Sequence, residues 1–212
     1  MRHLILVFIL VFFSGCAKYV ETNVSVFHAL QLPLNGVSYA ILPSKEQANS
    51  LEFQSYANLV KNEFQKQGMV EVPYEQAHFA VHLSYGIDGG KSVLISYPVY
   101  GQTGISSSYS TGTVNTVGNK KVFTGTTFNT PTYGVIGSES RREVLFTHFL
   151  NIDIEEMGKT ANKKVYEGKA VSVGDEATLL PVMPAMIRSV FQDFPGSSGT
   201  LRTDKTVLEK QK

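Results

Sequence analysis

Histidines at helix-like spacing are the first residues of this sequence that could carry metal chemistry. His78 and His82 are four residues apart, a spacing that on a helix would place two imidazoles over one ion. The residues around them alternate between apolar and polar types, which indicates a strand. On a strand the two side chains lie about 13 Å apart at ~3.3 Å per residue, too far for one Zn²⁺ with bonds of about 2 Å. We therefore expect both histidines to face solvent, and we predict no metal site.

His148 is the histidine that could act as a general base. It lies in an apolar stretch and shares one strand face with Phe146, Leu150 and Ile152. The spacing of the sequence assigns it neither a paired acid nor a nucleophile. We expect a hydrogen-bonded core histidine, and the alternative is the base of an envelope hydrolase.

Three carboxylates, Asp153, Glu155 and Glu156, crowd the end of the same stretch. Carboxylates serve as acid and base or as calcium ligands, but the glycine-punctuated spacing of a calcium loop is absent here, so we expect a solvated turn. The sequence contains no nucleophile elbow, phosphate-binding glycine loop or two-cysteine metal motif. We predict no catalytic residue and no cofactor.

The single cysteine, Cys16, follows an apolar run at residues 4–13 and two small residues. This run is half as long as the about 20 residues that span a bilayer, and it has the plan of a secretory signal peptide. The segment resembles the lipobox of bacterial lipoproteins. That resemblance implies a signal peptide at residues 1–15 and acylation of the Cys16 thiol. The alternatives are an ordinary secreted protein that loses Cys16 with its signal, and an uncleaved interfacial anchor.

Lipidation would also decide where the protein resides. Each buried methylene contributes about 0.8 kcal/mol, so two or three acyl chains hold a protein on a membrane. By similarity with lipoprotein sorting, Ala17 rather than Asp after the cysteine implies the outer membrane of a Gram-negative cell. We expect a cell-envelope protein anchored on the periplasmic face by acyl chains on Cys16.

The charge balance argues against nucleic acid as a partner. The chain has 19 basic and 18 acidic residues, and removal of the signal takes away Arg2 alone, leaving 18 of each. Attraction to phosphate requires clustered Lys and Arg. The nearest approach to a cluster, Arg141-Arg142, is followed at once by Glu143. We expect no nucleic-acid binding.

The apolar periodicity predicts a short series of elements. Helical spacing indicates a helix from Ser50 to Gly68 and a final helix from about Met183 to Phe194. Strands are expected at residues 37–42, 77–85 and 93–95, and a hairpin at residues 144–154 and 164–173.

This order of elements predicts an α+β fold. We expect a two-layer sandwich, in which a mostly antiparallel sheet carries two helices on one face, as a single domain at residues 33–195. The polar residues 16–32 read as a lipidated tether, and residues 196–212 as a disordered tail.

Residues 86–140 form an insertion dominated by Gly, Ser and Thr. Gly118-Asn119 suits a tight hairpin turn, so we expect one or two long hairpins or a flap. Tyr beside Ser and Gly gives rigid contact area with adaptable hydrogen bonding. The candidate partner-binding residues are therefore the aromatic ones of the insertion, Tyr97, Tyr100, Tyr109, Phe123, Phe128 and Tyr133. The alternative is a flexible surface loop whose aromatic residues pack back onto the sheet.

Several segments taken in order resemble one bacterial envelope family. They are residues 39–43, the helix that closes in Gln67-Gly68, and residues 77–85, 150–154, 165–170 and 191–195. The sequence is similar to the domain-of-unknown-function family numbered forty-one thirty-six, which consists of small putative lipoproteins. Where that family tends to have Trp, this chain has Tyr166. The resemblance implies an α+β envelope lipoprotein and carries over no catalytic residues.

Three functions compete at this stage. The first is a non-enzymatic binding or structural module that contacts an envelope protein through the insertion or an exposed sheet face. The second is a periplasmic carrier of a small apolar ligand, suggested by Phe53, Phe64, Met183, Met186 and Phe191. The third is the hydrolase that would use His148. We predict the first.

Overall fold

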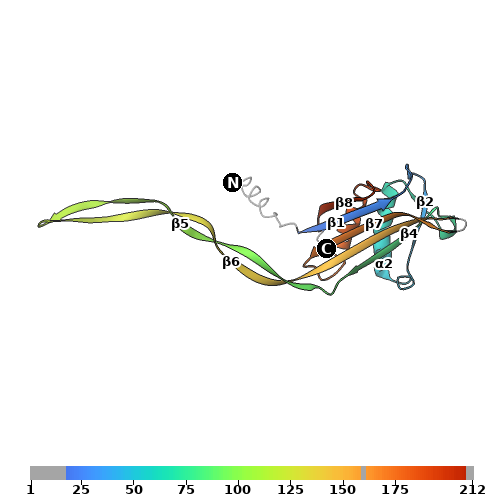
Figure 1. Ribbon diagram of the computed structural model, residues 1–212, viewed down its shortest axis with the longest axis horizontal. Coiled ribbons are helices and arrows are strands. Elements are labelled where there is room, and N and C mark those ends of the chain that lie inside the picture. Colours follow the sequence, from blue (N-terminus) through green and yellow to red (C-terminus); the bar gives the residue numbers. More distant parts are fainter. Residues whose placement is uncertain (1–17, 159–160, 209–212) are drawn as a thin grey trace, which may run out of the picture. The chain divides into compact units, whose positions relative to one another are not determined.

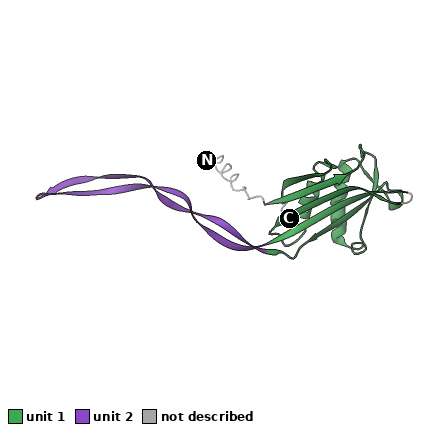
Figure 2. Ribbon diagram, viewed as in Figure 1, with its two compact units in different colours: residues 1–91, 145–212 green, residues 92–144 purple. Residues whose placement is uncertain are grey.

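The computed structural model describes residues 18–158 and 161–208, which fold as two compact units (Figure 2). One unit, which we call the sheet domain, runs up to Lys91 and resumes at Leu145. The other, which we call the ribbon, is Ser92–Val144. The predicted signal peptide and the acylation site at Cys16 lie outside the described residues.

The strands form one open sheet in the order β3-β2-β4-β6-β7-β1-β8, and β5 pairs with β6 (Figure 1). Their bounds are β1 Tyr19–His28, β2 Ser38–Leu42, β3 Val70–Glu71, β4 Phe79–Ile87, β5 Lys91–Val117, β6 Lys120–Glu156, β7 Lys163–Gly174 and β8 Thr200–Val207. The helices are α2 Leu51–Lys66, α3 Met183–Phe191 and the short 3₁₀ turn η2 Tyr74–Gln76.

The sheet is mixed, which only partly agrees with the expected antiparallel arrangement. Strand β1 pairs antiparallel with β7 and β8, and β6 pairs antiparallel with β4 and β7. Strand β2, however, runs parallel to both β3 and β4. A parallel pair needs a crossover connection, and α2 supplies it between β2 and the strands that follow. Because β3 is only two residues long, the sequence pattern did not reveal it.

Helix α2 forms where the sequence predicts it. The Ser50 hydroxyl caps the helix by accepting a hydrogen bond from the backbone N–H of Phe53 at 3.1 Å. The apolar side chains at spacings of three and four, Phe53, Tyr56, Val60 and Phe64, are all buried. Just beyond the helix, Gly68 has a φ of 78°, the left-handed conformation in which glycine carries no steric cost.

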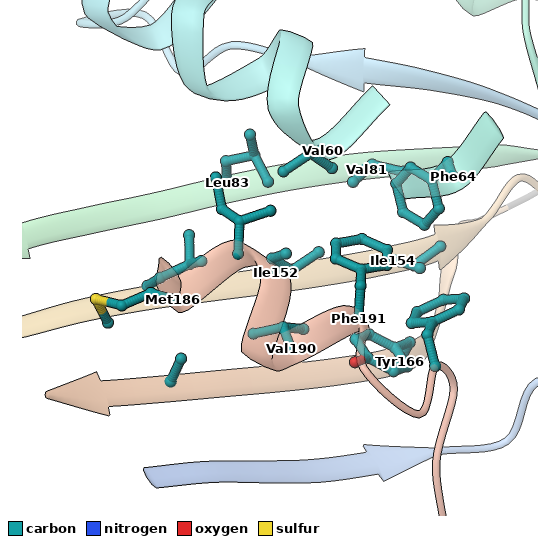
Figure 3. Close-up of a cluster of buried hydrophobic side chains, with 14 of the residues drawn as sticks. Val60, Phe64, Val81, Leu83, Ile152, Ile154, Tyr166, Met186, Val190 and Phe191 are labelled. Carbon is teal, nitrogen blue, oxygen red and sulfur yellow. The ribbon is translucent and has the colours of Figure 1, made fainter. Parts of the chain in front are cut away.

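Helix α3 completes the core, and Pro184 lies in its first turn, where a missing backbone N–H costs nothing. The helix ends at Phe191, three residues before the predicted Phe194. Phe194 is nevertheless buried, and its ring centroid lies 5.6 Å from that of Phe64. Side chains of α2, α3 and the central strands meet in one buried cluster (Figure 3). The cluster contains all the side chains that suggested a carrier of an apolar ligand, namely Phe53, Phe64, Met183, Met186 and Phe191.

The structure corrects the predicted tether at residues 16–32. Most of that segment is strand β1, which lies between β7 and β8. Along it Val20, Thr22, Val24 and Val26 are buried while the residues between them are mostly exposed. This period of two is that of a strand with one face in the core.

The predicted disordered tail at residues 196–212 is corrected as well, because residues 200–207 form β8 along the free edge of β1. The Arg202 guanidinium donates hydrogen bonds to the carbonyls of Ser189 and Val190 in α3, and it pairs with Asp204 at 3.0 Å. A cation at a helix C-terminus complements the unpaired carbonyls there. The prediction of disorder was wrong because the polar and charged composition of this segment gave no sign of an ordered edge strand.

Arg202 should be the residue that holds β8 in place. We expect Arg202→Met to lower the free energy of unfolding by roughly 1–3 kcal/mol. The substitution leaves the mostly buried Asp204 carboxylate and the carbonyls of Ser189 and Val190 without their hydrogen-bond donor. Amide exchange in Thr200–Val207 should accelerate. The matched control is Lys205→Met on the same strand, whose exposed pair with Glu21 is worth less than about 1 kcal/mol. Equal effects of the two variants would contradict this role.

Candidate functional site

The histidines at helical spacing lie on the solvent face, as predicted. His78 Nε2 is 3.3 Å from a Glu156 carboxylate oxygen, and His82 Nε2 is 3.9 Å from one of Glu155. Both histidine side chains are about half exposed. Asp153 pairs with Lys164 at 3.1 Å, also at the surface. Among residues 18–158 and 161–208 no three His, Cys, Asp or Glu side chains are grouped so as to hold a metal ion.

His148 is a buried core residue, also as predicted. It is 1% exposed, and its Nε2 lies 2.9 Å from the backbone carbonyl of Glu176. Its Nδ1 has no hydrogen-bond partner within the described part of the chain. The register places His148 beside Ser172 of β7, and Ser172 beside Thr22 of β1, so a polar row crosses the inner face of the sheet.

The ribbon is one long hairpin, one of the forms expected for the insertion, although its bounds are Ser92–Val144 rather than 86–140. Strand β5 ends at Val117 and β6 begins at Lys120, which leaves Gly118 and Asn119 as the predicted turn. Gly118 has a φ of 63°. A positive φ at the first turn residue suits a tight two-residue connection.

Rungs of polar side chains fix the register of the ribbon. Hydrogen bonds join Ser107 to Thr130, Ser108 to Asn129 and Ser110 to Thr127 at 3.1, 2.7 and 2.7 Å. Tyr109 therefore lies directly opposite Phe128, because both are bracketed by these rungs. Cross-strand aromatic pairs of this kind stabilise a sheet by a fraction of a kcal/mol up to about 1 kcal/mol.

The six candidate aromatic residues all lie in the ribbon, and all are exposed, from 40% for Tyr97 to 74% for Tyr133. The register places Tyr109 opposite Phe128, but the six residues do not line one pocket. Since side chains alternate between faces, the pairing assigns Tyr109 and Phe128 to one face and Phe123 and Tyr133 to the other. The Phe123 ring covers the close approach of Gly112 to Gly125, where a Cβ on either glycine would clash.

Tyr97 belongs to a small polar group within the ribbon. Its hydroxyl donates a hydrogen bond to a Glu143 carboxylate oxygen at 2.6 Å, and this bond raises the pKa of Tyr97 above its ordinary value. The Arg141 guanidinium carbon lies 6.0 Å from the ring centroid, within reach of a cation–π interaction. Tyr97 is also the least exposed of the six.

Aliphatic residues of the ribbon were missed as candidates, because only aromatic ones stood out from the Gly, Ser and Thr around them. Leu94, Ile105, Val135 and Ile136 are all more than half exposed. Ile136 lies over Gly101, where an added Cβ would be 2.4 Å from its Cδ1. Their alternation with small polar residues is the signal that would have included them.

The ribbon carries almost no charge between its two ends. From Ser92 to Ser138 the charged residues are Lys120 and Lys121, beside the turn. What the site offers is an extended surface of exposed apolar side chains, hydroxyl rungs and backbone edges. Such a surface suits contact with another macromolecule rather than a reaction at a point.

Within the sheet domain, Asp88 stabilises the turn that precedes β5 through hydrogen bonds. One carboxylate oxygen, Oδ1, accepts hydrogen bonds from the backbone N–H of Gly90 at 3.0 Å and of Thr147 at 2.9 Å. The Asp88 N–H in turn donates to the Thr147 carbonyl at 3.0 Å. The hydrogen bond from Thr147 is the main reason that the pKa of Asp88 is held below its usual value.

Asp88 should make stability depend on pH in acid. Because the folded-state pKa is depressed, the carboxylate contributes stability above the unfolded-state value of about 4 and loses it as pH falls through the folded-state pKa. We expect Asp88→Asn to be less stable than wild type at pH 7, and the difference to shrink below about pH 4. Urea unfolding across that range measures it. A difference that does not change with pH would contradict the assignment.

The sheet domain also has a surface groove of about 330 Å³. The residues that line it include Leu30, Leu34, His78, Phe79 and Glu156. Among the described residues no helix is long and apolar enough to cross a membrane.

A family model described as Domain of unknown function (DUF4136) matches residues 32–196. The chain belongs to this family. The matched DUF4136 region leaves out β1 and β8, the two strands that complete the sheet at one edge. Tyr166, at the position where the resemblance led us to expect Trp, is buried over Gly168, and a Cβ on that glycine would lie 2.7 Å from the phenol oxygen. The glycine thus makes room for the ring.

The chain is also similar to a solved structure, the crystal structure of a PDZ domain protein from Parabacteroides distasonis ATCC 8503. The identity is 11% and the TM-score 0.46, over 89% of this chain and 39% of that one. This chain therefore spans well under half the length of that protein. No curated protein matches the sequence.

Proposed function

We propose that this DUF4136 protein is a lipid-anchored lipoprotein of the bacterial envelope and that it acts as a non-enzymatic binding module.

 The binding surface is the ribbon, and its partner is an envelope protein on the periplasmic side of the outer membrane. The anchor is Cys16, acylated after removal of residues 1–15. The sheet domain supports the ribbon, and we infer that its helices and sheet form a two-layer α+β sandwich.

The observation that carries this proposal is the exposure of apolar side chains along the ribbon. More than half of the large apolar side chains that are exposed in the described chain lie in Ser92–Val144. By contrast, the ribbon contributes no residue to the buried core cluster found among the described residues. An isolated two-stranded hairpin is at best marginally stable in water, and large exposed apolar patches mark interaction sites. A ribbon of this length is therefore best explained by a partner that covers it.

The chemistry of the ribbon suits a protein partner. Each of its strands presents one edge of backbone N–H and C=O groups to which a further strand can add. Exposed Tyr and Phe supply rigid contact area, and Ser and Thr supply adaptable hydrogen bonds. The anchor has separate support in the sequence, since Cys16 follows a short apolar run and two small residues.

Two measurements test the proposal. The first is the intact mass of protein extracted from membranes, compared with that of Cys16→Ala. A chain that begins at Cys16 and carries acyl groups, both lost in the variant, is expected. An unacylated chain in the soluble fraction would contradict the anchor.

The second measurement is chemical cross-linking in cells followed by identification of the products. We expect the double variant Tyr109→Ala, Phe128→Ala to lose its cross-linked partner. The matched control is Leu51→Ala, which removes an exposed side chain of the sheet domain and should keep the partner. If the ribbon variant keeps it too, the ribbon is not the binding surface.

A further inference from the structure

We propose that the partner covering the ribbon is a second copy of this chain. The inference rests on the proposed function, in that it names the protein bound by the ribbon. The β5 edge of one copy would pair antiparallel with the β6 edge of the next.

The first argument is the state of the two ribbon edges. Because Val117 and Lys120 flank a two-residue turn, they form a hydrogen-bonded pair, and every second N–H from there points outward. On β5 the outward set includes Ser108 and Ser110. On β6 it includes Pro131, which has no N–H to donate and is tolerated in a strand at such an outward position. Among residues 18–158 and 161–208, neither edge of the ribbon is paired with a further strand.

The second argument is the lack of protective charge. Natural edge strands avoid unwanted pairing by carrying charged side chains, especially Lys. The ribbon has no charged side chain from Ser92 to Val117, and on the other strand charges stand only near the two ends: Lys120 and Lys121 beside the turn, and Glu139, Arg141, Arg142 and Glu143 at the base. The two edges of the ribbon therefore suit each other, because they are similar in length and both lack charge over most of that length. Between these charged ends, a second copy therefore meets the edge without burying an unpaired charge.

The third argument is area. Strand β5 has 27 residues, which at ~3.3 Å each extend about 90 Å. A contact strip about 10 Å deep, the spacing of packed sheets, then covers on the order of 900 Å² on each chain. Stable protein interfaces bury about 800 Å² per partner. Edge pairing along the ribbon is therefore large enough to hold two copies together.

The contact is heterologous, because it joins the β5 edge of one copy to the β6 edge of another. Such contacts close into rings or continue as open rows. Each copy in the row keeps one free edge for the next. Copies anchored in one membrane also share an orientation, which this pairing requires, since neighbouring ribbons point the same way.

The test is the molecular mass in solution of the full protein, purified from the fraction in which it is found. Light scattering, with correction for detergent where it is present, should give a mass above that of one chain. Two variants block one edge each. Ser108→Pro with Ser110→Pro removes outward donors from β5, and Thr127→Pro with Asn129→Pro removes them from β6. Each variant loses the same two hydroxyl rungs, so each is the control for the other.

The predicted result is specific to edge pairing. Any contact requires one intact β5 edge and one intact β6 edge, and growth beyond a dimer requires both edges on the same copy. Since each variant alone lacks one kind of edge, it should be monomeric, and an equimolar mixture should form dimers. Circular dichroism of each variant checks that the sheet domain remains folded.

Other outcomes overturn the inference. A monomeric wild-type protein that still cross-links to an envelope protein of different sequence would refute self-pairing and leave the proposed function standing. Wild-type association that survives in both variants would place the contact elsewhere than on the ribbon edges. A monomer with no cross-linked partner of any kind would remove both proposals.

Discussion

Replacing Ser92–Val144 by a short glycine-rich loop is expected to leave the sheet domain folded and to abolish its association with other chains. The described core cluster lies entirely within the sheet domain, with contributions from α2, α3 and the strands. Removal of the ribbon therefore takes away no buried side chain of that cluster. The core contribution to the free energy of unfolding should change by less than about 1 kcal/mol. The midpoint of thermal unfolding should therefore stay within a few degrees of that of wild type.

Circular dichroism and light scattering on the same sample measure both halves of this result. A protein that fails to fold without the ribbon would show that the ribbon is part of the structural core. A folded protein that still associates would show that the binding surface lies elsewhere, for instance on the solvent face of the sheet. The point variants of the ribbon separate these explanations, because they preserve chain length.

Phe64→Ala is expected to have the largest effect on stability. The Phe64 side chain is fully buried, and its ring centroid lies 4.8 Å from that of Tyr39 and 5.0 Å from that of Phe191. Truncation of such a side chain leaves a cavity and costs about 3–5 kcal/mol. This is a large fraction of the 5–15 kcal/mol typical of a folded domain.

The matched control for this variant is Phe128→Ala, the same substitution at a ribbon residue that is 59% exposed. It should change the free energy of unfolding by less than about 1 kcal/mol while weakening association. Urea unfolding of the two variants measures the contrast. Similar losses of stability would contradict the division between a core in the sheet domain and a contact surface in the ribbon.

The helices and central strands could be predicted because their local signals agree with their packing. In α2 the Ser50 cap, the apolar spacing and Gly68 all indicate the same helix. In β4 and β6 the alternation places Val81 and Ile152 in the core. Where local pattern and burial coincide, a single sequence is enough.

The two strands at one edge of the sheet could not be recognised so easily. In β1 the buried positions include Thr22, and exposed Tyr19 and Phe27 blur the contrast between the faces. In β8 the inward side chains are Arg202, Asp204 and Thr206, whose burial depends on α3 and not on hydrophobicity. Tertiary contacts, which no short window of sequence contains, order both strands.

The candidate site was predictable as a region but not as an arrangement. Gly118-Asn119 indicated the turn, and the aromatic residues marked the segment. The pairing of Tyr109 with Phe128 depends on the register that the serine and threonine rungs set. That register follows from counting outward from the turn, which is possible only once a single hairpin is known to occupy the whole segment.

Hydrogen–deuterium exchange along the ribbon of the associated, membrane-extracted protein tests the central claim most directly. If another chain covers the ribbon, the outward-pointing amides of β5, such as those of Ser108 and Ser110, should exchange slowly, and they should lose this protection when association is abolished by the β6-edge variant Thr127→Pro with Asn129→Pro. Exchange of these amides within seconds in the wild-type protein, at a concentration where it is associated, would contradict the account.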